Sequence, residues 1–460
     1  MSAHRMTNGL KMLAFTLLLF SFPAVAFADW EDILAKFRPR ITAQEQYLDN
    51  IFYTNTNRIS DYITTISPGL TFSTSPSPIP FSSSGAISSS GSGLTSFSTE
   101  RKEVKYGLDL DYSPGFNFYA HNSNLNYVSQ TGTLNTWYTF GQHLTVKVWE
   151  YFIRSENPWE NYVTSQPQPP GVYYLGTNQT LAIYTRNIFE PSLTYQFGRE
   201  DRFELTFQDM TYYNTSPTIE DYRLDSLTPR LTYWFDIHNG IILEYRFLNA
   251  DYQISPDFTS QHARGRYTYR FNPQTSIFGE YTFDTVNYES PGVNYYVQNP
   301  SVGITQAFSP TLNGRAQVGY FWQVPQTGNT ASGPSFDVGI NQRTTRTTYD
   351  LAFRGGYQYV FGTTAGSTGF TKYYQSIGSI THQLATRLSV GIQEWVGRYD
   401  FVQQNDQIDW IWQVEGNVSY QLFRWLTASF IAYHRQDNSS VSTASYKANT
   451  AMLRLTATYW

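Results

Sequence analysis

The chain has 460 residues with 36 acidic and 31 basic side chains, and it contains no cysteine. This balance gives no electrostatic footprint for nucleic acid, and without thiols there are no disulfides, thiolate metal sites or cysteine nucleophiles. Aromatic residues make up 17% of the chain, yet a mean hydropathy of −0.41 excludes a bundle of membrane-spanning helices. A chain that is polar on average and rich in tyrosine suits a wall with one face in lipid and the other in water.

A secretory signal peptide is predicted over residues 1–28. Basic residues precede the apolar run Met12–Phe22, and the small-x-small sequence Ala26-Phe27-Ala28 precedes Asp29. A membrane anchor needs roughly 20 apolar residues, so this run is too short for that alternative. The sequence therefore predicts export across the inner membrane and cleavage after Ala28.

Residues 29–39 are predicted to form a short periplasmic segment. Asp29 can cap a helix over Trp30–Phe37, whose apolar side chains share one face, and Pro39 ends that helix. So short a helix is marginal alone. We expect it to fray, to dock at the periplasmic mouth of a barrel, or to bind a periplasmic export component.

Two segments near the start of the mature chain carry a family resemblance. They are Gln44–Phe52, which reads QEQYLDNIF, and Ser60–Leu70, which reads SDYITTISPGL, with a polar loop between them. Together they resemble the opening hairpin of a group of outer-membrane β-barrel, porin-like proteins, some of which are associated with exopolysaccharide export. The resemblance implies a transmembrane barrel, and it brings no catalytic or substrate-binding residues with it.

Two stretches interrupt the strand pattern. Residues 75–99 are rich in serine, glycine and proline and are predicted to form a flexible loop, which strand parity assigns to the periplasmic side. Residues 156–179 contain four prolines and are predicted to form a long outer loop that can fold over the mouth of the barrel.

Apolar and polar residues alternate in segment after segment between residues 40 and 460. Every second residue is apolar or glycine from Tyr349 to Tyr359, from Ala263 to Phe271 and from Trp410 to Tyr420. Segments of about ten residues cross a bilayer as tilted strands, and tyrosine and tryptophan near their ends indicate an aromatic girdle. The predicted fold is all-β, a transmembrane antiparallel up-and-down β-barrel over residues 40–460 with about 18–20 strands.

Short and long connections alternate between these segments. The predicted short turns are Gly198–Asp201, His238–Gly240, Asn272–Thr275, Pro310–Asn313 and Ala385–Thr386, and the longer connections are residues 214–224, 253–261, 326–335, 403–407 and 436–447. Bacterial barrels have tight periplasmic turns and larger outer loops, whereas a β-sandwich has little reason to keep this alternation. An even number of strands then puts both termini on the periplasmic side.

Charged residues on four neighbouring predicted strands share the polar face: Arg230, Glu244, Arg246, Arg264, Arg266, Arg270, Glu280 and Asp284. Five arginines among three carboxylates give a local excess of positive charge in a protein that is acidic overall. We predict that these residues line the lumen, where a ladder of arginines would attract anionic solutes or sugar acids. The alternative is cross-strand ion pairing that only builds the inner wall.

No cofactor, metal site or catalytic site is expected. The histidines are scattered over different strands and turns, without the spacing of metal ligands. His434, Asp437 and Ser439 have the residue types of a hydrolase triad, but loops are rich in the same types. Asp49 and Asn50 either ligate Ca²⁺ with other loop carboxylates or cap a turn.

The chain ends on a predicted strand, Ala451–Trp460, with Tyr459 and Trp460 as its last residues. An aromatic end resembles the C-terminal sorting signal of barrels that the outer-membrane assembly machinery inserts. The apolar face of this strand holds Tyr459, so Trp460 is out of phase with it, which makes the signal a variant. The expected partners are this assembly machinery and the lipid of the outer membrane.

Three classes of function remain. A porin-like channel or export conduit of the cell outer membrane is favoured, because a barrel this wide encloses an aqueous or plugged lumen. Anionic solutes or polysaccharide are its candidate cargo. A surface-structural or adhesion barrel without transport is the alternative, and a barrel-embedded hydrolase is the third, although we expect no enzyme.

Overall fold

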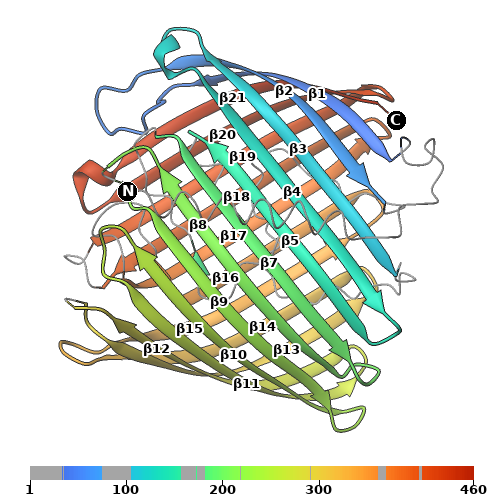
Figure 1. The fold of residues 1–460 in the computed structure, drawn as a ribbon, viewed down its shortest axis with the longest axis vertical. Coiled ribbons are helices and arrows are strands. Elements are labelled where there is room, and N and C mark those ends of the chain that lie inside the picture. Colours follow the sequence, from blue (N-terminus) through green and yellow to red (C-terminus); the bar gives the residue numbers. More distant parts are fainter. Residues whose placement is uncertain are drawn as a thin grey trace.

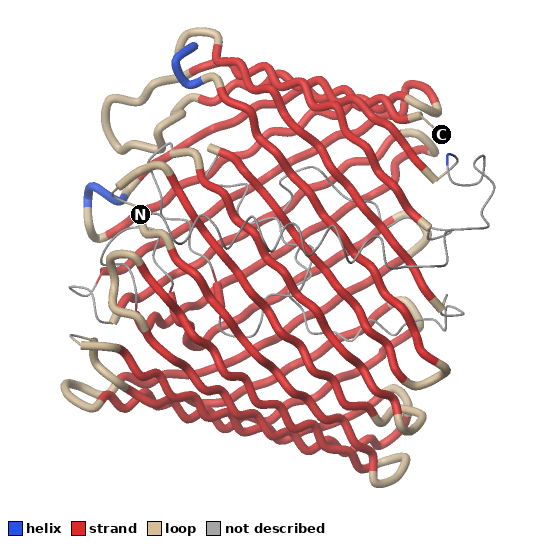
Figure 2. Tube along the Cα trace, viewed as in Figure 1, coloured by secondary structure: helices blue, strands red, loops and turns tan. Residues whose placement is uncertain are grey.

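The computed structural model describes residues 34, 36–74, 105–156, 172–173, 182–217, 219–290, 292–360, 369–402 and 407–459. They form a closed, antiparallel up-and-down barrel of 20 strands, in which each long strand pairs with its neighbours along the chain (Figures 1 and 2). The last strand pairs with the first, from Arg40↔Thr458 to Leu48↔Thr450, and this closes the wall. The predicted fold and strand number are confirmed.

The strands of the wall are β1 (Phe37–Leu48), β2 (Asp61–Ser73), β3 (Tyr106–Tyr119), β4 (Tyr127–Phe140), β5 (Leu144–Ser155), β7 (Tyr184–Gln196), β8 (Arg202–Asn214), β9 (Tyr222–Trp234), β10 (Asn239–Tyr252), β11 (Phe258–Asn272), β12 (Thr275–Tyr288), β13 (Tyr295–Ser309), β14 (Leu312–Pro325), β15 (Ala331–Arg343), β16 (Thr347–Val360), β17 (Gly369–Ala385), β18 (Leu388–Phe401), β19 (Gln407–Phe423), β20 (Leu426–Ser439) and β21 (Tyr446–Thr458). A further strand, β6 (Val172–Tyr173), has two residues. Two short 3-10 helices, Ser123–Leu125 and Ser442–Ala444, lie in connections. Among the described residues, no helix is long and apolar enough to cross a membrane.

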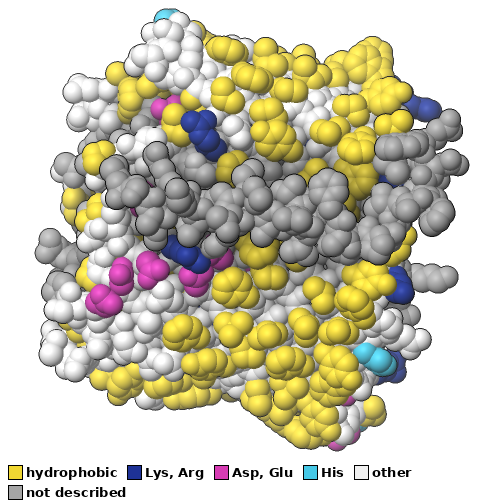
Figure 3. Space-filling view, viewed as in Figure 1, with side chains coloured by type: hydrophobic (Ala, Val, Ile, Leu, Met, Phe, Trp, Pro, Cys, Tyr) yellow, Lys and Arg dark blue, Asp and Glu magenta, His cyan; other side chains and the backbone are white. Residues whose placement is uncertain are grey.

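The alternation of residue types explains the two faces of the wall. On β11, Tyr267, Tyr269 and Phe271 are exposed on the outer surface, while His262 and Arg264 between such positions are largely buried on the inner face. Exposed hydrophobic side chains occur on the other long strands of the wall except β5, and Figure 3 shows them on one face of the barrel. An apolar outer band and a polar interior are the pattern of a barrel that crosses a bilayer.

The short turns all lie at one end of the barrel, and local polar side chains form them. In the turn between β9 and β10, Asp236 accepts hydrogen bonds from the backbone N–H groups of His238 and Asn239 at 2.7 and 2.8 Å. Asn272 does the same between β11 and β12. The start of β1 and the end of β21 lie at this end too, which the tight turns identify as periplasmic.

The opposite end carries the longer connections, and buried polar residues fix several of them. The Asn50 amide donates to the carbonyl oxygens of Thr54 and Lys447 at 2.8 and 2.9 Å and accepts from the Thr54 N–H. Asn50 therefore caps a turn, as one of the two interpretations of the Asp49-Asn50 pair predicts.

Some boundaries differ from those that the sequence predicts. β1 already begins at Phe37, so Phe37–Pro39 belong to the wall, although the sequence assigns them to the periplasmic segment. Pro39 is tolerated because the first residues of a strand need few ladder donors. Residues 1–33 and 35, which include the predicted signal peptide and most of the predicted helix, lie outside the described residues, as do residues 75–99. Their neighbours Ser73 and Tyr106 lie at the periplasmic end.

Candidate functional site: the inner wall of the barrel

The charged residues singled out in the sequence lie on the inner face of four adjacent strands. They are Arg230 on β9, Glu244 and Arg246 on β10, Arg264, Arg266 and Arg270 on β11, and Glu280 and Asp284 on β12. Each of these strands has exposed aromatic or aliphatic residues at the intervening positions, such as Leu243, Tyr267 and Tyr281. The strand register therefore brings the charged side chains together on one wall.

Cross-strand ion pairs connect several of these side chains into a row, and we call the whole set of eight residues the charged strip. Arg266 Nε lies 2.7 Å from Glu280 Oε2, and Arg264 contacts both Glu280 and Glu244, at 3.9 and 3.3 Å. Arg230 lies 3.9 Å from Glu244 on its other side. The strip thus alternates in sign across β9–β12, which stabilises the pairing of these strands.

Three further residues extend the charged strip beyond those found in the sequence. Glu204 on β8 lies 3.7 Å from Arg230 and 3.2 Å from Arg202, and Glu200 in the preceding turn lies 2.8 Å from Arg270. Six arginines then stand among five carboxylates, so the positive excess is smaller than the sequence indicates. Arg202 and Glu204 alternate with the apolar residues of β8, a signal that could have placed them on the inner face.

The periplasmic end of the charged strip lies at the mouth of the barrel. Arg270 donates to both carboxylate oxygens of Glu200, at 3.2 and 2.8 Å, and its guanidinium lies 3.9 Å from the centre of the Trp234 ring. The hydrogen bonds and charge of Arg270 lower the pKa of Glu200, so this carboxylate stays ionised.

A buried polar network lies towards the outer end of the same wall. His262 Nδ1 is 2.7 Å from one carboxylate oxygen of Asp284, and the Tyr357 hydroxyl donates to the other at 2.7 Å. Tyr357 belongs to β16, which is separated from β12 by three strands of the wall. A direct contact between these strands requires part of the wall to fold inward.

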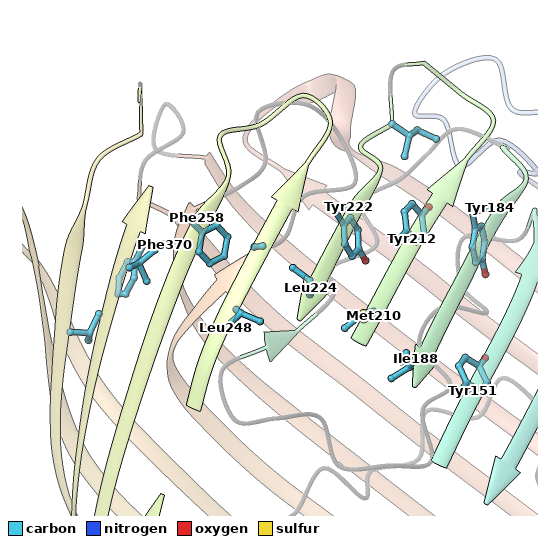
Figure 4. Close-up of a cluster of buried hydrophobic side chains, with 14 of the residues drawn as sticks. Tyr151, Tyr184, Ile188, Met210, Tyr212, Tyr222, Leu224, Leu248, Phe258 and Phe370 are labelled. Atoms are coloured by element: carbon cyan, nitrogen blue, oxygen red, sulfur yellow. The ribbon is translucent and has the colours of Figure 1, made fainter. Parts of the chain in front are cut away.

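Aromatic side chains fill the outer half of the inner face. Tyr212 stacks on Tyr184 and Tyr222 with ring centres 5.5 and 5.1 Å apart, and further aromatic contacts continue from Tyr222 to Phe370. Figure 4 shows this cluster, to which β5, β7–β15 and β17 contribute buried side chains. The sequence interpretation assigned aromatic residues mainly to the lipid face and missed this inner set, because it did not follow the polar face to the strand ends.

The outer ends of β16 and β17 fold into the lumen. Outward-facing residues of β16, such as Tyr349 and Phe353, are exposed on the outer surface, and by the two-residue period Tyr357 belongs to the same face of the strand. Yet the Tyr357 ring packs 5.1 Å from that of Phe321, on the inner face of β14. Phe370 of β17 packs in the same way on Tyr295 and Phe321. We call Gly356–Val360 with Gly369–Thr371 the inward-folded end.

Strand β6 reaches the inward-folded end from the other side of the barrel. Val172 and Tyr173 pair in parallel with Tyr359 and Val360 of β16, although the connection that contains β6 joins β5 to β7. The prediction that residues 156–179 fold over the mouth agrees with this pairing. Most of that connection lies outside the described residues.

The hydrolase and metal interpretations find no support in the described part of the chain. His434 points to the outer surface and contacts Asn449, whereas Asp437 is buried on the inner face, so the triad candidates lie on opposite sides of the wall. No group of three or more potential metal-ligating side chains occurs among the described residues.

Comparison with known proteins agrees with the barrel. Residues 252–459, from the end of β10 to the end of the described chain, match the family described as "Putative beta-barrel porin 2". This segment differs from residues 44–70, on which the resemblance in the sequence rests, and the expected kinship with porin-like outer-membrane barrels is confirmed. No curated protein matches the chain.

Several solved structures align with most of the chain. The siderophore receptor PirA from Pseudomonas aeruginosa aligns with a TM-score of 0.47 and 8% identity, over 92% of this chain and 80% of that chain. The ferric citrate transporter FecA aligns with a TM-score of 0.47 and 10% identity, over 92% and 79%. The outer membrane protein opdK from Pseudomonas aeruginosa aligns with a TM-score of 0.43 and 7% identity, over 92% and 99%. The chain is thus similar to porin-like β-barrels of the outer membrane, and its residues 252–459 carry the match to the "Putative beta-barrel porin 2" family.

Proposed function

We propose that the protein is a channel or export conduit that favours anionic solutes, acidic polysaccharide included. The observation that carries the proposal is an inequality of exposure within the charged strip. The side chains of Arg230 and Arg266 are 31% and 24% exposed, whereas those of Glu244 and Glu280 are 11% and 7% exposed. At these two pairs, in the middle of the strip, a solute meets the guanidinium groups before it meets their partner carboxylates, whereas at the periplasmic end Glu200 is more exposed than Arg270, at 45% against 27%.

This arrangement favours anions for a local reason. Charges in a lumen act on ions within about one Debye length, roughly 10 Å at 0.1 M salt, so distant acidic loops contribute little. Paired arginines keep unused N–H donors that can hydrogen-bond carboxylate or phosphate groups. If the ion pairs serve only the wall, the strip carries no selectivity, and an adhesion barrel without transport becomes the better alternative.

Conductance in planar bilayers tests the proposal. Purified protein is expected to give discrete steps and to favour anions at low salt. Replacing Arg264, Arg266 and Arg270 with glutamine removes three positive charges from the strip, so the reversal potential should move towards cation preference. The double variant Arg266→Gln/Glu280→Gln removes an exposed guanidinium together with its buried partner, so its reversal potential should move in the same direction by a smaller amount.

A charge change outside the strip provides the second control. Arg58 is exposed in the connection between β1 and β2, so Arg58→Gln should have little effect on selectivity. An unchanged reversal potential in the triple variant would show that the charged strip only stabilises the wall and does not select ions. Absence of conductance from folded protein would contradict an open channel.

A further inference from the structure

The ladder between β15 and β16 stops before either strand ends. Its last pair towards the outer end is Phe336↔Gly355, although β15 continues to Ala331 and stays paired with β14 down to Gln323↔Ala331. β16 continues to Val360 and stays paired with β17. Five residues on each strand, Ala331–Ser335 and Gly356–Val360, thus remain regular strand but do not pair with each other.

The existing register defines a second pairing for these residues. If the ladder continued beyond Phe336↔Gly355, Ser335 would face Gly356 and Ala331 would face Val360. Gly356 has a φ of 157°, a conformation that favours glycine, at the point where the strands part. In the described structure, the edge of β16 is instead paired with β6. The same edge therefore has two mutually exclusive partners.

Some contacts stabilise the inward position of the inward-folded end, and some buried polar groups destabilise it. The Tyr357 hydroxyl donates to Asp284, and Phe370 packs among Tyr295 and Phe321. Against these contacts, both amide atoms of Gln358 and the hydroxyl of Thr371 are buried and have no hydrogen-bond partner among the described residues. Each buried unpaired group costs about 1–3 kcal/mol, so the inward position is opposed from within.

We propose that the outer half of the β15–β16 seam is a two-state gate. In the closed state the end of β16 lies inside the lumen, with Tyr357 latched on Asp284. In the open state Gly356–Val360 pair with Ala331–Ser335, the end of β16 joins the wall, and the outer mouth widens. A bistable element of this kind changes in discrete steps, because packed interfaces do not deform continuously.

Disulfide trapping detects the open state. Because the chain contains no cysteine, no native thiol competes with the introduced pair. In the open register Ser332 faces Tyr359, so a disulfide in the pair Ser332→Cys/Tyr359→Cys shows that the two strand ends have paired. The pair Val338→Cys/Phe353→Cys is its positive control, since Val338 and Phe353 are already partners and have the same parity in the ladder. Both pairs are placed in the full-length protein, folded in membranes and oxidised.

The expected result is slow crosslinking of the reporter pair and fast crosslinking of the control pair. Adding Tyr357→Phe removes the latch but keeps the ring, so it should accelerate the reporter roughly tenfold, because a hydrogen bond to a charged group is lost. Tyr349→Phe, on the lipid face of the same strand, should leave the rate unchanged. A reporter that stays reduced, that crosslinks as fast as the control, or that ignores Tyr357→Phe would overturn the gate.

Conductance then connects the gate to transport, and this step rests on the proposed function. Oxidised reporter protein is expected to show a larger and steadier conductance than the same protein after reduction. Equal conductance in the two forms would overturn the gate as a control of the pore. If no form conducts, the proposed function fails, while crosslinking still decides whether the strands exchange partners.

Discussion

Glu220 joins two outer connections that are separated by a hairpin. It lies in the connection between β8 and β9, and its fully buried carboxylate accepts hydrogen bonds from the N–H groups of Ile254 and Ser255 at 2.6 and 2.8 Å. The Ser255 hydroxyl donates to its second oxygen at 2.6 Å. One side chain thus satisfies the backbone of a neighbouring loop, which otherwise has no strand partner at this point.

Glu220→Ala is expected to loosen the connection between β10 and β11 without unfolding the barrel. Each buried donor left without an acceptor costs about 1–3 kcal/mol, and the loss falls on one local opening reaction. Hydrogen exchange should accelerate at the amides of Ile254 and Ser255. Asp251→Ala, at an exposed position on β10, is the matched control and should leave these amides protected; equal protection in both variants would contradict the role of Glu220.

The sequence predicts some of these residue positions and not others, for a physical reason. Arg264 and Arg266 can be assigned to the inner face because the two-residue period of a strand is written locally, next to Tyr267 and Tyr269. The contact of Tyr357 with Asp284 depends on where β16 leaves the wall. On periodicity alone, Tyr357 belongs to the lipid face, and only the packing of non-neighbouring strands reverses that assignment.

At the scale of elements, the alternation of residue types and the turn residues predict where the hairpins lie. They do not predict where each strand begins and ends. The predicted short turns lie between strands as expected, because Asp236 and Asn272 form them by contacts within a few residues. β15 begins at Ala331, inside a stretch that the sequence assigns to a loop. Its serine, glycine and proline residues disfavour a strand locally, and pairing with β14 outweighs that preference.

The closing pair of strands gives a prediction about assembly. Deleting residues 451–460 removes the partners of Arg40–Tyr47 on β1 and leaves the edges of β1 and β20 open. Because unpaired backbone groups are costly in lipid, the truncated chain should not form a barrel either in cells or by refolding into detergent. Heat-dependent migration in SDS gels measures both.

A point change distinguishes the predicted sorting signal from the closing strand. Trp460 lies outside the described residues, and the ladder between β1 and β21 ends before it. Trp460→Glu should therefore impair insertion by the assembly machinery in cells, while refolding into detergent persists. Normal insertion of this variant in cells would show that the aromatic end is not read as a signal.

At the scale of the whole molecule, the many exposed apolar side chains on the outer wall, of which Figure 3 shows one face, require surrounding lipid. The mature protein should therefore fractionate with outer membranes and migrate differently in SDS gels before and after heating. These two measurements test the barrel independently of any transport. Recovery of the folded protein from the periplasm or the medium would contradict it.

The open edge of β15 also fixes how deeply the barrel is immersed. Backbone N–H and C=O groups without partners cannot face hydrocarbon, and among the described residues Ala331–Ser335 have no strand partner on the side of β16. The hydrocarbon boundary must then lie on the periplasmic side of Ser335. Tyr320 and Trp322, which pair with Pro334 and Ser332 and are exposed on the outer surface, stand at the level where aromatic rings meet lipid headgroups. The seam thus opens at the height of the headgroups, where water can hydrate its edge.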